Sequence, residues 1–156
     1  MKGKHVGIGI LAIAALAGGG IYYLQEYHYY DRVDAAAVTI RLTPVHGGRP
    51  QAIPVSGLQA IDAGSSPIRF RACFTTSLST AMLTETYQLY DAAEPLTAPR
   101  WFDCFDAAEI GAALETGEAV AFLSEANVAP GVDRIVAAFD DGRAYAWTQI
   151  TPESAD

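Results

Sequence analysis

Residues 6–24 of the chain read VGIGILAIAALAGGGIYYL and contain no charged side chain. A helix of this length, at about 1.5 Å per residue, is about 28 Å long and matches the apolar core of a bilayer. The only lysines, Lys2 and Lys4, precede the stretch, and all eighteen acidic residues follow it. Because cationic flanks stay in the cytoplasm, we predict a cytoplasmic tail at 1–5, one transmembrane helix at 6–24 and export of the rest.

The same stretch also fits a cleaved export signal, because Ala15 and Ala17, on either side of Leu16, precede Gly18 as small residues would at a cleavage site. Against cleavage, the apolar run continues past this point and ends in an aromatic cluster at 27–30 (YHYY), which suits the headgroup layer. We therefore favour an anchor retained in a bacterial inner membrane, with the C-terminal part in the periplasm. Cleavage near Ala17 would release the same part into the periplasm.

Small residues recur at three- and four-residue spacings within the predicted span, at Gly7, Ala14, Ala15, Gly18 and Gly19. Small side chains let transmembrane helices approach closely, so this face could pack against another integral membrane protein. Alanine and glycine are also common in simple anchors, so the segment could equally be an anchor that packs against no other helix. The expected partners are thus the lipid bilayer and an integral membrane protein.

The remainder of the chain is strongly acidic, with eight arginines, no lysine and eighteen acidic residues, a formal charge of −10. Such a surface repels nucleic acid and anionic headgroups, so we expect no nucleic-acid partner and no polybasic lipid-binding role. About 125 residues after the aromatic cluster suffice for one domain with a core and not for two. We place an interfacial segment and stalk at 25–36, an α+β domain at 37–150 and a frayed tail at 151–156.

Cys73 and Cys104 are the only cysteines, and each is flanked by large aromatic residues. In an oxidising compartment such a pair is expected to form a disulfide, which would stabilise the fold by about 3–4 kcal/mol in the chain-entropy model. A redox pair or a copper(I) site has less support, since there is no C-x-x-C spacing and only Met82 lies nearby as another sulfur ligand. We predict a buried structural disulfide.

Alternation of apolar and polar residues predicts strands at 37–43, 52–55, 68–74, 119–123, 133–139 and 144–150. Residues 140–143 (DDGR) read as a tight hairpin between the last two strands. In 68–74 the arginines and Cys73 share one face and the apolar residues share the other. These features predict a mostly antiparallel sheet.

Residues 106–115 form the clearest helix of the domain. Asp106 and Glu109 give a capping arrangement, and Gly117 supplies the stop. The stretch 77–90 fits either a short helix capped by Ser77 or extended chain. The predicted fold is α+β, with one N-terminal transmembrane helix followed by a small, mostly antiparallel domain that carries one or two short helices.

No arrangement of residues indicates catalysis, a metal or a cofactor. Among the three histidines only His46 falls well inside the domain, in a turn without an acidic neighbour. The glycines are scattered, which argues against a phosphate-cradling loop. Arg69, Arg71 and Arg100 could converge as an anion clamp. The simpler interpretation places them on the solvent face of a strand, paired with the abundant acids.

Four segments together resemble one protein family: residues 22–25 (YYLQ), 65–76 (SSPIRFRACFTT), 81–87 (AMLTETY) and 101–106 (WFDCFD). The sequence is similar to an uncharacterised family of short, single-span, membrane-anchored proteins of alphaproteobacteria. The resemblance covers nearly the whole chain, and the two cysteine segments are its most specific part. It implies an anchor and a single domain, and it implies no activity, cofactor or site residue.

We expect a non-catalytic accessory subunit or assembly factor of a larger inner-membrane complex, for example a respiratory one. The alternative is a periplasmic binding module for a small anionic ligand, which requires Arg69, Arg71 and Arg100 to converge on one pocket. An enzyme of unrecognised type would need a cleft with titratable groups shifted by burial.

Overall fold

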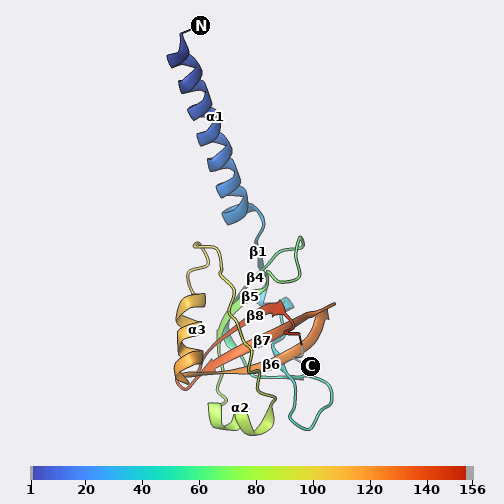
Figure 1. The fold of residues 1–156 in the computed structure, drawn as a ribbon. Helices are drawn as coiled ribbons and strands as arrows, with labels where there is room; N and C mark the ends of the chain where they lie inside the picture. Colours follow the sequence, from blue (N-terminus) through green and yellow to red (C-terminus); the bar gives the residue numbers. More distant parts are fainter. Residues whose placement is uncertain (1, 154–156) are drawn as a thin grey trace.

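The computed structural model describes residues 2–153, so the last three residues of the expected tail lie outside the described part. A long helix, α1 (Gly3–Tyr23), stands away from a sheet domain and continues at its base as a π-helical turn, Leu24–His28 (Figure 1). No residue of α1 is buried, and Gly3–His28 is long and apolar enough to cross a membrane. The expected single apolar helix is confirmed, and it begins at Gly3, ahead of the uncharged stretch.

The domain is built on an antiparallel sheet of six strands. Their spatial order is β1 (Asp31–Val33), β4 (Ser56–Asp62), β5 (Arg71–Thr75), β8 (Arg143–Ile150), β7 (Val132–Phe139) and β6 (Ala119–Ala129). A smaller sheet pairs β2 (Arg41–Leu42) with β3 (Gln51–Ala52). Two short helices complete the domain, α2 (Thr80–Thr86) and α3 (Ala107–Thr116). This confirms the α+β class with a mostly antiparallel sheet.

Both faces of the main sheet are covered. One, which we call the α2 face, packs Phe70, Ala72 and Phe74 against Leu83 of α2 and the β2–β3 region. The other, the α3 face, packs Cys73 and Trp147 under α3 and the irregular segment 91–105. The alternation at 68–74 therefore sorted the residues correctly between two faces. The expectation of a solvent face for Arg71 is wrong, because segment 91–105 covers it and leaves the residue 3% exposed.

The start of the domain differs from the expected stalk at 25–36. Asp31–Val33 forms strand β1, which pairs with β4 at the edge of the sheet, and a 3₁₀ turn follows at Ala35–Ala37. Paired backbone groups satisfy each other's hydrogen bonds, so this segment belongs to the sheet. The expected strands at 37–43 and 52–55 shrink to the two-residue strands β2 and β3, and β4 was not predicted.

The capping, stop and turn residues predicted from the sequence agree with the structure better than the predicted strand bounds do. Asp106 accepts hydrogen bonds from the backbone N–H groups of Ala108 and Glu109, and Gly117 ends α3 with a φ of 79°. The ambiguous stretch 77–90 contains helix α2, whose cap is Ser79 and not Ser77. The β7–β8 hairpin turns where it was expected.

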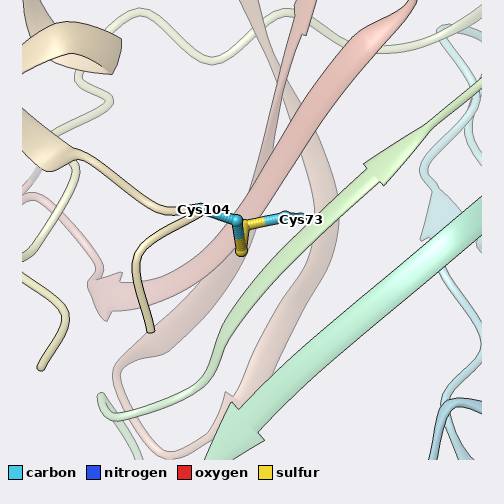
Figure 2. Close-up of a disulfide and its surroundings, with 2 residues drawn as sticks. All are labelled: Cys73 and Cys104. Atoms are coloured by element: carbon cyan, nitrogen blue, oxygen red, sulfur yellow. A yellow bond between two sulfur atoms is a disulfide. The ribbon is translucent and has the colours of Figure 1, made fainter. Parts of the chain in front are cut away.

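The disulfide forms as predicted. Cys73 of β5 and Cys104 of segment 91–105 are bonded, with Cα atoms 6.3 Å apart (Figure 2). The bond fixes an irregular segment to the central part of the sheet. Phe102 and Phe105 on either side of Cys104 are buried in the same cluster as Trp147.

A cleft between the base of the long helix and the domain

The base of α1 is fastened to the domain. The carbonyl oxygen of Glu26 accepts a hydrogen bond from the indole N–H of Trp101, and its carboxylate accepts one from the backbone N–H of Arg100. The guanidinium of Arg32 in β1 lies 5.1 Å from the centre of the Trp101 ring, a cation–π contact. Segment 91–105 thus reaches from the sheet to the helix base, as Figure 1 shows for the yellow chain between α2 and α3.

Beside this joint lies a cleft of about 570 Å³, within the usual size range of ligand sites. Three segments distant in sequence form its walls: the helix base with Tyr30, the loop before β5, and the segment 95–99. Its lining comprises Gln25, Glu26, Tyr30, Ser66, Ile68, Arg69, Arg71, Pro95, Leu96, Thr97, Ala98 and Pro99.

Arg71 holds two of these walls together. Its Nη1 donates to the carbonyls of Ile68 and Phe70 at 2.8 and 2.7 Å. Its Nε and Nη2 donate to the carbonyls of Leu96 and Thr97 at 3.0–3.2 Å. The guanidinium thereby satisfies backbone acceptors that belong to no helix or strand.

The charge of Arg71 is nevertheless uncompensated at close range. Among residues 2–153 no carboxylate forms an ion pair with it. Burial, together with the charge of Arg69, lowers the pKa of Arg71 to about 10, against the opposing influence of Tyr30 and Asp62. The side chain is still cationic at neutral pH, and buried charges are normally paired.

Arg69, two residues earlier, is half-buried and lines the same cleft. Its guanidinium carbon lies 5.4 Å from the ring centres of both Tyr29 and Tyr30. Within the described part of the chain it has no carboxylate partner. Stacked on two rings, it retains donor groups that a ligand can use.

The structure therefore brings together two of the three arginines of the predicted clamp. Arg100 is exposed and lies outside the lining of the cleft, although its backbone N–H bonds to Glu26 at the rim. The sequence interpretation missed Glu26, Tyr30 and Trp101. The sequence indicates a membrane-interface role for the aromatic cluster at 27–30, and its contact with Arg69 does not follow from spacing along the chain.

Other candidate features lie elsewhere. Gly7, Ala14, Ala15, Gly18 and Gly19 are exposed on α1, and nothing lies within 4 Å of a Cβ placed at any of these three glycines. Across residues 2–153 no group of three His, Cys, Asp or Glu side chains could hold a metal ion.

One polar pair interrupts the α2 face. Arg134 and Thr148 are cross-strand neighbours on β7 and β8, and the Arg134 guanidinium lies 4.3 Å from the centre of the Phe70 ring. Arg134 also pairs with Glu125 at 3.3 Å. The Nε of Arg134 and the hydroxyl of Thr148 are buried without a hydrogen-bond partner among the described residues.

Residues 40–155 match the sequence model of a family described as "Family of unknown function (DUF6446)". The match includes both cysteines and both arginines of the cleft, and it begins after α1 and β1. Comparison with curated proteins and with solved structures finds no match.

Proposed function

The chain belongs to this family of unknown function, and we propose that it is a non-catalytic accessory subunit or assembly factor of a larger inner-membrane complex. In this proposal α1 spans the membrane with Lys2 and Lys4 in the cytoplasm, and the sheet domain lies in the periplasm. The lysines ahead of the span support the orientation. The Cys73–Cys104 bond supports an oxidising compartment, and the resemblance to anchored alphaproteobacterial proteins supports the bacterial setting.

The observation that carries the proposal is the joint between helix and domain. A domain that is only tethered needs no contact with its anchor, whereas here Glu26 bonds to both Arg100 and Trp101. Arg69 and Arg32 add cation–π contacts on either side of the joint. A domain with a fixed orientation on its helix can present one constant surface to a membrane-bound partner.

The exposed helix supplies the second half of such an interface. The five small residues of α1 lie at spacings that place them on one side of the helix, and none is covered within the chain. A neighbouring transmembrane helix could approach this side closely. We therefore propose that the partner contacts α1 and that the joint fixes the orientation of the domain toward this partner.

The test is affinity purification of the tagged full chain in a mild detergent, followed by mass spectrometry of the proteins that accompany it. Gly18→Leu should abolish recovery of a stoichiometric membrane complex, because it fills the small-residue side. Gly20→Leu makes the same change about 200° around the helix and is the matched control. A wild-type chain that migrates alone at its own mass contradicts the proposal.

A second function is favoured by the cleft: a binding module for a small anionic ligand. Arg69 and Arg71 supply two positive charges to one cleft without a paired carboxylate among the described residues. Titration of the detergent-solubilised full chain with inorganic phosphate, sulfate and succinate tests it by calorimetry. Binding that Arg69→Gln weakens supports this function, and the absence of heat with all three anions contradicts it.

A further inference from the structure

We infer that the cleft beside the helix base binds the phosphate of an anionic phospholipid headgroup. The inference deepens the second function proposed above and rests on the proposal that α1 spans a membrane.

The cleft lies at the depth of the headgroups. Gln25 and Glu26, in the π-helical turn that directly continues the apolar helix, form one wall. Tyr23, Tyr27 and Tyr29 surround the same level of the chain, and tyrosine rings settle at the membrane–water boundary. A lipid of the leaflet in which α1 ends therefore reaches the cleft without leaving the bilayer.

The positive charges of Arg69 and Arg71 favour binding of an anion in the cleft. The N–H groups of Arg71 bond to carbonyl oxygens, which orient the guanidinium but carry no net charge. Cation–π contacts with Tyr29 and Tyr30 position the guanidinium of Arg69 and leave its N–H donors available. The planar arrangement of these donors matches the oxygens of a phosphate. A phosphate at Arg69 would also lie close to the buried charge of Arg71.

The remaining lining suits the rest of a lipid headgroup. Ile68, Pro95 and Leu96 present apolar surface toward which a glycerol backbone and the first acyl carbons can pack. Glu26 is the carboxylate of the lining, and its acceptor bond to the N–H of Arg100 holds it at the joint. A soluble anion would use the charges but not this apolar surface.

The net charge of the domain does not oppose this arrangement. A surface of −10 disfavours adsorption from solution onto an anionic membrane. Here α1 already holds the cleft at the bilayer, so one headgroup binds at a high effective concentration and no attraction over long distance is needed.

Native mass spectrometry of the full chain, reconstituted in vesicles of equal parts phosphatidylglycerol and phosphatidylcholine and released into the spectrometer, tests the inference. We expect one phosphatidylglycerol per chain to be retained in preference to phosphatidylcholine. Arg69→Gln should lower this retention about tenfold. Arg49→Gln removes the same charge from an exposed turn and should leave retention unchanged.

The inference is overturned by no retained phospholipid, by equal retention of the two lipids, or by equal retention in the Arg69 and Arg49 variants. Inorganic phosphate added to the wild-type chain separates the sources of the anion. Millimolar phosphate that displaces the lipid completely assigns the site to a free phosphate and not to a headgroup. The far-ultraviolet melting curve of Arg69→Gln must match that of Arg49→Gln, and Arg69→Lys, which keeps the charge but not the fork, should retain an intermediate amount. None of these outcomes depends on finding a partner complex. The lipid inference can therefore fail while the accessory-subunit proposal holds, and the reverse is also true.

Discussion

The two faces of the main sheet are stabilised in different ways. The α2 face packs aromatic and aliphatic side chains from strands, from α2 and from the residues that flank them, with Leu83 of α2 among its fully buried residues. The α3 face is covered in large part by segment 91–105, which has no regular backbone pairing of its own. That segment is held by a disulfide, by the hydrogen bonds that Arg71 donates to the carbonyls of Leu96 and Thr97, and by buried aromatic residues. On the α3 face a segment without regular structure is thus fixed by a covalent bond and by side-chain hydrogen bonds, whereas α2 is held on the other face by apolar packing of Leu83.

The largest expected effect is on the α3 face. Replacing Cys73 and Cys104 together by alanine should lower the free energy of unfolding by about 3–4 kcal/mol, because the open loop regains conformational freedom in the unfolded state. Urea unfolding without reductant measures this difference. With reductant the wild-type chain should approach the double variant, and equal stability of the two in oxidising buffer would refute the role given to the bond.

On the α2 face, Leu83→Ala should cost about 3 kcal/mol, the transfer and cavity cost of a fully buried leucine. Met82, its neighbour on the same helix, is 53% exposed. Met82→Ala is therefore the control, with an expected change within about 0.5 kcal/mol. Similar losses for the two variants in urea unfolding would mean that α2 does not seal this face.

Arg71→Met keeps an apolar stem of comparable length and removes every donor to the carbonyls of loop 68–70 and segment 96–97. We expect a loss of about 2 kcal/mol from the buried acceptors left without partners. Hydrogen exchange should accelerate chiefly in segment 91–105. Arg41→Met, at a more exposed arginine paired with Glu125 at 3.6 Å, should cost less than about 1 kcal/mol. An equal cost at both positions would show that Arg71 does not fix the segment.

The smallest effect has the opposite sign and concerns the polar pair of the α2 face. Thr148→Val removes a buried hydroxyl that has no partner among the described residues, and it should raise the free energy of unfolding by about 1 kcal/mol. Thr43→Val removes a hydroxyl that donates to the carbonyl of Ser124 at 2.8 Å, and it should lower stability by about the same amount. Thermal unfolding that shows a loss for both would mean that Thr148 is satisfied in solution.

Features that depend on neighbouring residues were predictable from the sequence. The Asp106 cap and the Gly117 stop act within α3, and the alternation at 68–74 follows from the geometry of a strand. Strand β1 was mistaken for a stalk because three residues carry no usable period. Strand β4 escaped notice because glycine is disfavoured in strands and because the adjacent apolar residues Ala60 and Ile61 break the period of two.

The candidate site was predictable only in part, for the same reason. Arg69 and Arg71 share a face because they are two residues apart, and this placed them together correctly. The segment that buries Arg71 has no periodic signal, and the joint connects Glu26 to Trp101 across about 75 residues of chain. Long-range contacts of that kind follow from packing, which spacing along one sequence does not encode.

With α1 in a membrane as proposed, the joint at Glu26 would make the orientation of the domain depend on the thickness of the bilayer. Transmembrane helices commonly tilt by about 20° to fit their apolar length to the surrounding lipid. Since Glu26 bonds the base of α1 to Arg100 and Trp101 of the domain, such a tilt would turn the domain along with the helix. In a thin membrane the domain would lean toward the lipid surface, and in a thick one it would stand upright above it.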